Sequence, residues 1–587
     1  MSYISGVKNG DTVTIWERDE EGNRKTVEYP APYYFYVPSE DGDYKSLYGD
    51  KLQRLDFHTG KEFYNAKKQF EASKVPMFES DISPVYKVLT DNYYGVKDPD
   101  LNVTFYDIEV DYKNIKYDSE HIVRIRYNGK EKDISVGELR AIPDRNICEV
   151  FDEYTEKWME VDKSDYMYTG KTGFSSVSDP YAIVNSVALI HMHLNKIVVI
   201  AIPPENPNCE VPNVGTMGDN YLKKMNDIAP IIDGVEVEIK IVSSERTLLR
   251  LFLEEIESSD IICGWNNSGF DDPYVGKRLE KMGNKFLKRL CFPDAPPPRW
   301  EDVEIFGKKQ PIIRLNGRVS LDYLTLFKKY MVENQPSYSL EFIADKFLRT
   351  NGEPDLPKLE YEGSLASLYK DNFLYFIRYN IRDTEILKGF EDKFKYVALA
   401  NTMVHISTGQ FKDVAGTIML TEMAVINYCH HELDVIVNDK IEEDWGEEKI
   451  QGAIVLDPVV GMHDWVSSID LNSLYPSAIR TCNISPDTKM GQFLIEEDAF
   501  NAINSKTDDD LELIYSDGTS ESLPAYEWKN ELIERNWCMS SFGTVFTKDK
   551  KGVIPMILED WYTSRKKYQK NMAVAKDAAL DILKKYE

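Results

Sequence analysis

The stretch Asn102-Val-Thr-Phe-Tyr-Asp107-Ile-Glu109-Val110 decides the fold, because it predicts a strand that carries two carboxylates. Side chains two residues apart in a strand point to the same face, so Asp107 and Glu109 project together while Ile108 faces the other layer. Burying a carboxylate is costly unless a cation meets it. The pair therefore indicates a metal site. The alternative, a solvated edge strand, is disfavoured by the flanking apolar residues.

A second segment with acidic residues is Gly264-Trp-Asn-Asn-Ser-Gly-Phe270-Asp271-Asp272-Pro273, between a predicted strand at 260–264 and a predicted helix. Asp271 then stands at the carboxyl end of a strand, where α/β sheets hold their ligands. The same pattern suits a helix cap with Pro273 in the first turn. This segment alone leaves both interpretations open.

A third segment, Tyr379-Asn-Ile-Arg-Asp383, lies in a helix predicted over about 372–393. The i, i+4 spacing places the phenol and the carboxylate on one helical face, where they could orient a water molecule. A capped or salt-bridged surface helix is the alternative. Taken with the other two segments, the carboxylates form the oxygen-ligand set that a two-metal phosphodiester hydrolase requires, which suits Mg²⁺ or Mn²⁺. These ligands are Asp107, Glu109, Asp271 and Asp383.

Length and composition predict an ordinary multidomain globular chain. The 587 residues are too many for one hydrophobic core, and no apolar run is as long as a membrane helix. The seven cysteines form no CxxC pair, which fits a reducing compartment, and the first residues lack the features of a secretion signal. The formal net charge of −29 argues against nucleic acid as a partner, yet residues 562–587 carry seven basic against three acidic side chains.

The order of elements predicts mixed α/β and α+β architecture. A β-rich region of about a hundred residues comes first, and strands and helices alternate between 196 and 264. Asn128-Gly129 predicts a type I′ hairpin over 122–136, within a β-rich insertion at about 113–172. Residues 396–441 are predicted to be mostly helical. A further strand over 459–469 is predicted to end at Asp470.

The order of these motifs resembles the family B DNA polymerases. Asp-Ile-Glu, Asn-x3-Phe-Asp-x-Pro and Tyr-x3-Asp are similar to the three exonuclease motifs, and Asp470-Leu-Asn-Ser-Leu-Tyr475-Pro-Ser477 is similar to polymerase motif A. Asn334-Gln-Pro-Ser-Tyr-Ser-Leu340 and Asn483-Ile-Ser-Pro486 most resemble the replicative enzymes of T4-like bacteriophages. The resemblance covers nearly the whole chain. It implies a DNA-directed DNA polymerase with a proofreading 3′-5′ exonuclease and two Mg²⁺ or Mn²⁺ ions per active site.

The resemblance assigns each site residue a role. Asp107, Glu109, Asp271 and Asp383 would bind the exonuclease metals, and Tyr379 would position the attacking water. Asp470 would be one of two palm metal ligands. The nucleotide-binding set is Leu471, Asn472, Ser473, Leu474, Tyr475, Arg565, Lys566 and Lys570. In it, the backbone from Leu471 to Leu474 would run beneath the triphosphate, Tyr475 would stack on the incoming sugar, and Arg565 would grip the triphosphate.

Four departures from the family pattern stand out. Position 569 is Gln where the family has lysine, so Lys566 or Lys570 would replace it. Ile450-Gln451-Gly452-Ala453 lacks the tyrosine of the motif between the two active sites, and the insertion precedes Gly173-Phe174, which resembles a loop that handles the frayed primer. The motifs Lys-x3-Asn-Ser-x-Tyr-Gly and Asp-Thr-Asp-Ser are absent. We therefore expect a fragment or the amino-terminal product of a split gene.

The expected domains are a β-rich domain at 1–106 completed by 396–441, an RNase H-like exonuclease domain at 107–395, a partial palm at 442–551 and a first fingers helix at 552–587. Expected partners are primer-template and single-stranded DNA, deoxynucleoside triphosphates, a sliding clamp and a carboxyl-terminal polymerase chain. No membrane contact is expected, and the location is the host cytoplasm. The alternatives are a free-standing 3′-5′ exonuclease and a non-catalytic nucleic-acid-binding subunit.

Overall fold

The computed structural model describes all residues except 111–121, 143–147, 153–156, 161–174, 205, 207–208, 306–307, 351–352, 355, 357–358, 360, 362–363, 441–455, 472, 495 and 587. The chain forms two compact units. The first unit is Met1–Pro32 with Ser83–Leu420, and the second is Tyr33–Ile82 with Thr421–Glu587. Of the sequence motifs, Asn472, Gly173-Phe174 and the run 450–453 lie outside the described residues.

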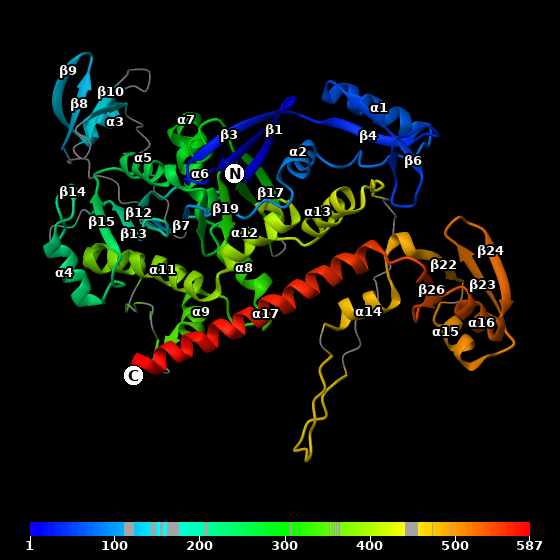
Figure 1. The fold of residues 1–587 in the computed structure, drawn as a ribbon. Helices are drawn as coiled ribbons and strands as arrows, with labels where there is room; N and C mark the ends of the chain where they lie inside the picture. Colours follow the sequence, from blue (N-terminus) through cyan, green and yellow to red (C-terminus); the bar gives the residue numbers. More distant parts are fainter. Residues whose placement is uncertain are drawn as a thin grey trace. The chain divides into compact units, whose positions relative to one another are not determined.

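A seven-stranded mixed sheet forms the centre of the first unit (Figure 1). In spatial order its strands are β14 (Gly215–Thr216), β15 (Glu236–Ile241), β13 (Lys196–Ala201), β12 (Val184–His191), β7 (Val103–Val110), β16 (Ile261–Gly264) and β19 (Val319–Asp322). β7 pairs antiparallel with β12 and parallel with β16. The predicted strand at 102–110 is therefore confirmed as an interior strand of a mixed sheet.

Helices bury the sheet because their sequences carry the required caps and apolar faces. All eight residues of β12 are buried, and both α5 (Glu245–Glu255) and α11 (Phe373–Phe394) pack on it. The Ser244 side chain accepts from the Thr247 N–H at the start of α5, and Asn372 accepts from the Tyr375 N–H at the start of α11. The helix predicted over 372–393 is thereby confirmed.

The remaining elements of the first unit surround this sheet. They are β1 (Ser2–Asn9), β2 (Thr12–Arg18), β3 (Arg24–Pro30), α2 (Pro84–Tyr93), α4 (Asp219–Ile228), α6 (Asp271–Met282), α7 (Asn284–Lys288), β17 (Arg299–Ile305), β18 (Lys308–Arg314), α8 (Tyr323–Tyr330), α9 (Leu340–Phe347), β20 (Arg349–Thr350), β21 (Glu353–Pro354), α10 (Leu365–Asp371) and α12 (Tyr396–Ser407). α13 (Ile418–Tyr428) crosses into the second unit, and the helices found between 396 and 433 confirm the helical prediction there.

The predicted insertion contains a small sheet of its own. Its strands are β8 (Ile122–Tyr127), β9 (Lys130–Ser135), β10 (Cys148–Asp152) and β11 (Lys157–Glu160), with α3 (Val136–Ala141) beside them. Asn128 and Gly129 have φ angles of 49° and 73°, as a type I′ turn requires. The predicted hairpin is confirmed.

The second unit contains two antiparallel sheets. The smaller has β4 (Tyr33–Pro38), β5 (Tyr44–Lys45) and β6 (Lys51–Phe57), followed by α1 (Gly60–Ala72). The larger has β22 (Lys489–Phe493), β23 (Asp510–Tyr515), β24 (Ser520–Pro524), β25 (Trp537–Met539) and β26 (Thr544–Thr547), with α14 (Leu474–Cys482), α15 (Glu496–Ser505), α16 (Ala525–Glu534) and the long α17 (Val553–Tyr586). No helix among the described residues is long and apolar enough to cross a membrane.

The strand predicted over 459–469 is wrong. Residues 456–471 have no strand assignment, and Met462 and Trp465 have relative exposures of 101% and 100%. A strand needs a neighbour to satisfy its backbone N–H and C=O groups. No described strand of the second unit pairs with this segment, so the apolar pattern that predicted a strand remains in extended, exposed chain.

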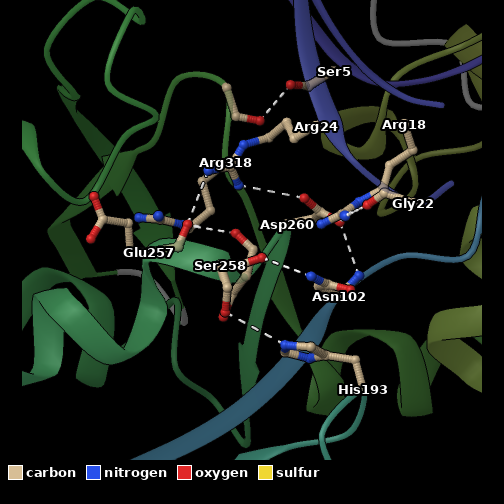
Figure 2. A network of polar contacts seen from close by, with 12 residues as sticks. Ser5, Arg18, Gly22, Arg24, Asn102, His193, Glu257, Ser258, Asp260 and Arg318 are labelled. Carbon is tan, nitrogen blue, oxygen red and sulfur yellow. Dashed lines mark hydrogen bonds and ion pairs between the residues drawn. The ribbon is translucent and has the colours of Figure 1, made fainter.

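A buried charge network joins the amino-terminal strands to the central sheet (Figure 2). Asp260, which is fully buried just before β16, accepts from Arg18 Nε at 2.7 Å and from the Asn102 backbone N–H at 2.9 Å. Arg24 lies 3.6 Å from the same carboxylate. Arg318 is a further buried cation in this region. Burial and, to a lesser extent, the positive charge of the nearby Arg24 lower its pKa to about 10. Asp260 thus holds the starts of β7 and β16 against β2 and β3.

Replacing Asp260 with alanine is expected to lower the free energy of unfolding by about 3–5 kcal/mol, because buried arginines lose their counter-charge. Urea unfolding followed by circular dichroism measures this. The control is Asp133→Ala, which breaks an exposed pair with Arg124 and should cost about 0–1 kcal/mol. Equal losses in the two variants would contradict a special role for the network.

Candidate active site

Three carboxylates from two elements converge at the centre of the first unit. The possible ligand atoms of Asp107, Glu109 and Asp383 all lie within 4.8 Å of one another. Asp107 and Glu109 come from one face of β7, as the alternation of strand side chains requires, and Asp383 comes from α11, which packs on β7. Glu109 and Asp383 are buried, and Asp107 is half-buried.

This carboxylate cluster fits a hard divalent cation. All three donors are carboxylate oxygens, the ligand type that Mg²⁺ and Mn²⁺ prefer. Like charges this close in a buried place repel one another, and a bound cation would offset that repulsion. The cluster is therefore a candidate site for a divalent metal ion.

Tyr379 lies one helical turn before Asp383 on α11. Burial raises the pKa of Tyr379 well above its ordinary value, and the negative charges of Asp383, Glu109 and Asp107 raise it further. The phenol therefore stays neutral and can donate or accept a hydrogen bond beside the carboxylates.

Asp271 lies beside the cluster, where β16 leads into α6. Its Oδ1 accepts from the backbone N–H of Ile108, the residue between Asp107 and Glu109, at 3.2 Å. The group of three within 4.8 Å does not include Asp271. Burial raises the pKa of Asp271 to about 7, against the opposing effect of the Ile108 hydrogen bond. A nearby cation would favour its ionised form.

Asp272 was given no role by the sequence, yet it anchors the same turn. It is buried and accepts hydrogen bonds from the Tyr106 hydroxyl on β7, from the Ser320 hydroxyl on β19 and from Asn267 Nδ2, the last at 3.1 Å. Burial raises the pKa of Asp272 to about 6. The only indication in the sequence was a second acidic residue in the run Phe270-Asp271-Asp272-Pro273.

Asn380 is a second residue that sequence reasoning missed. It stands between Tyr379 and Asp383 in the third motif, and its Nδ2 donates to Asp107 Oδ2 at 2.8 Å. Spacing along a helix does not reveal such a contact, because it depends on how α11 is placed over β7. Its position inside a motif was the one available indication.

The predicted polymerase residues lie in the second unit and are largely exposed. Asp470 and Tyr475 are exposed, the latter at 72%, and Asp470 belongs to no group of three possible metal ligands among the described residues. Arg565 of α17 donates to the Ser473 hydroxyl, just before α14, at 3.4 Å. Four further predicted residues are exposed: Leu471 and Leu474 near α14, and Lys566 and Lys570 on α17. The structure thus brings Arg565 to Ser473, whereas it places Asp470 in no group of three possible metal ligands among the residues it describes.

Comparison with known proteins defines the class of this chain. Residues 415–585 match the family model described as DNA polymerase family B, and residues 207–343 match that of the DNA polymerase family B exonuclease domain. Both models describe parts of the same family, and together they match about half of the chain. The chain belongs to DNA polymerase family B.

Individual relatives agree with this family. The DNA-directed DNA polymerase of Enterobacteria phage T4 is 25% identical over 99% of this chain and 55% of its own length. That of Escherichia phage RB69 is 29% identical over 57% of this chain and 33% of its own length. The DNA polymerase of Pyrococcus horikoshii is 24% identical over 43% of this chain and 20% of its own. The chain thus spans about half the length of these relatives or less.

Removing the Tyr106 hydroxyl tests whether its hydrogen bond to Asp272 stabilises the turn beside the carboxylate cluster. Tyr106→Phe takes one of three donors from buried Asp272, so we expect a loss of about 1.5–3 kcal/mol in unfolding free energy, the range for hydrogen bonds to charged groups. Urea unfolding measures it. Tyr361→Phe, at a tyrosine that is 38% exposed, is the matched control and should be close to neutral. Equal stability of the two variants would rule out this anchoring role.

Proposed function

We propose that the first unit is a metal-dependent 3′-5′ exonuclease that acts on DNA. The observation that carries this proposal is the convergence of Asp107, Glu109 and Asp383 within 4.8 Å on a buried strand and its covering helix. The match of residues 207–343 to an exonuclease domain, which includes Asp271, supports it. A mixed sheet with carboxylates on an interior strand also supports the RNase H-like assignment of this unit.

The residues can be given roles in phosphodiester hydrolysis. Asp107, Glu109, Asp383 and Asp271 would hold Mg²⁺ or Mn²⁺, two ions in the full site. When bound, such a pair of ions activates water and stabilises charge on the attacking and leaving oxygens. Tyr379, kept neutral by burial and by Asp383, orients the water through its hydroxyl. Asp272 and its donors keep the turn that carries Asp271 against β7.

The second unit would supply part of a nucleotide-addition site. We propose that Asp470 is a palm metal ligand, that the segment from Leu471 to Leu474 lies beneath the triphosphate, and that Tyr475 contacts the sugar. The exposed cations of α17 would bind the triphosphate through Arg565, Lys566 and Lys570. The match of residues 415–585 to family B and the contact of Arg565 with Ser473 support this.

Both sites would act within a complete replicative polymerase. Its partners would be primer-template DNA, deoxynucleoside triphosphates, a sliding clamp and a complementary polymerase polypeptide. Exposed Met462 and Trp465 favour such a polypeptide as a neighbour, because large apolar side chains are stabilised when a partner covers them. The free-standing exonuclease is the second candidate, and the carboxylate cluster serves it equally well. Primer extension separates the two.

The exonuclease proposal predicts loss of 3′-end digestion in Asp107→Ala. The wild-type chain with Mg²⁺ or Mn²⁺ is expected to shorten a 5′-labelled single strand, and the variant should lose at least about 100-fold in rate because a metal ligand is gone. EDTA should abolish the wild-type activity. Gel analysis of the products measures both. An inert but folded wild-type chain, or a fully active variant, would disprove the proposal.

The polymerase proposal predicts that the 587-residue chain by itself does not extend a primer. Two-metal nucleotidyl transfer needs a second palm carboxylate, and the exposed Asp470 belongs to no group of three possible metal ligands among the described residues. Adding a polypeptide with the Asp-Thr-Asp-Ser motif should restore extension and co-elute with the chain on gel filtration. Robust extension by the chain alone would overturn the two-carboxylate argument, whereas a mixture that neither extends nor co-elutes would favour the free-standing exonuclease.

A further inference from the structure

A chain of two hydrogen bonds ends on one oxygen of Asp107. Ser186 Oγ donates to Asn380 Oδ1 at 2.8 Å, and Asn380 Nδ2 donates to Asp107 Oδ2 at 2.8 Å. Ser186 and Asn380 are both fully buried. We call these three residues the Ser186 relay. Its members come from three different elements, β12, α11 and β7.

The direction of the Ser186 relay follows from the chemistry of its ends. An ionised carboxylate only accepts hydrogen bonds, so the Asn380 amide must turn its NH₂ group towards Asp107. Its carbonyl oxygen then faces Ser186, whose hydroxyl can donate. Each group has the role that its neighbour requires, and reversing the amide would set two acceptors against each other at Asp107.

The Ser186 relay is anchored on the strand next to the ligand strand. Ser186 of β12 pairs in register with Glu109 of β7, and two positions along the same strands Ala188 pairs with Asp107. The hydroxyl is therefore fixed by the same ladder that places both β7 carboxylates. Asn380 lies on α11, the helix that carries Asp383. Its hydrogen bond to Asp107 therefore connects the two elements that supply the carboxylates, α11 and β7.

We propose that Asn380 is a positioning residue that holds one oxygen of Asp107 and so directs the carboxylate towards the metal, and that Ser186 fixes the orientation of the Asn380 amide. This inference rests on the proposed exonuclease function. Partners that hydrogen-bond to metal ligands orient them, and losing one typically costs 10–100-fold in metal affinity or activity. The three carboxylates stay in place in such variants, but Asp107 can turn away.

The test measures Mn²⁺ binding to the full chain by electron paramagnetic resonance, without DNA. Asn380→Ala is expected to weaken Mn²⁺ binding by about 10–100-fold, and Ser186→Ala by a smaller factor. The double variant should bind no more weakly than Asn380→Ala, since both changes break one chain of contacts. In exonuclease assays, the Mn²⁺ concentration for half-maximal rate should rise, while KM for DNA stays unchanged and the rate at saturating Mn²⁺ largely recovers.

Asn401→Ala is the matched control. Asn401 on α12 is also buried and donates through its amide, but to the Pro99 carbonyl at 2.8 Å. Its loss should leave Mn²⁺ affinity unchanged. If Asn401→Ala weakens binding as much as Asn380→Ala does, the effect is general destabilisation and the proposal fails. If Asn380→Ala does not fold, Ser186→Ala decides: unchanged Mn²⁺ affinity in that variant also overturns the proposal.

Failure of the proposed function gives a different result. If Asp107→Ala binds Mn²⁺ as tightly as the wild-type chain, the cluster is not the metal site and both proposals fall. If Asp107→Ala loses Mn²⁺ while the Asn380 and Ser186 variants keep wild-type affinity, the exonuclease site stands and the Ser186 relay is only structural.

Discussion

The structure of the first unit has to hold three carboxylates close together in its interior, despite their mutual repulsion. Two like charges about 4 Å apart repel by about 4 kcal/mol at the effective dielectric of a protein near its surface. Asp107, Glu109 and Asp383 meet under these conditions, with two of them buried. A bound cation would offset this repulsion, and the surrounding elements hold the three side chains in place. Many contacts in the described part of the first unit serve to hold β7, which carries two of these carboxylates, in place.

The surroundings act at both ends of β7. At its start, Asp260 joins the Asn102 backbone to Arg18, which fixes where the strand enters the sheet. Towards its carboxyl end, Asp271 and Asp272 bind the strand through the Ile108 N–H and the Tyr106 hydroxyl. Each of these carboxylates is itself buried and hydrogen-bonded. The network explains why so acidic a region can exist within an apolar core.

The second unit shows the opposite situation. The larger of its two antiparallel sheets has a buried core that includes Trp528, whereas residues 456–471 have no strand partner and expose nearly every side chain. The exposed segment ends at the residues that resemble polymerase motif A. Asp470, which lies in this exposed segment, belongs to no group of three possible metal ligands among the described residues. The two units differ in how much of their proposed site is assembled within one chain.

The sequence by itself determined the elements whose pattern is local. Alternation predicted the strand that became β7, the third motif was assigned to the helix that became α11, and Asn128-Gly129 predicted its hairpin, because each depends on neighbours within a few residues. It also indicated the acidic motifs in their order along the chain. It failed at residues 459–469, because an apolar pattern specifies a strand only when a partner strand is present.

Tertiary structure alone decided which side chains meet. Asn380 contacts Asp107 from 273 positions away, and Tyr106 contacts Asp272 from 166 positions away. Neither contact produces a periodic pattern in the sequence, because each depends on how a helix or a turn is placed over a strand. The same placement put Asp383 within 4.8 Å of both β7 carboxylates and left Asp271 beside that group. Local patterns specify elements, whereas the geometry of a site comes from packing between elements distant in the chain.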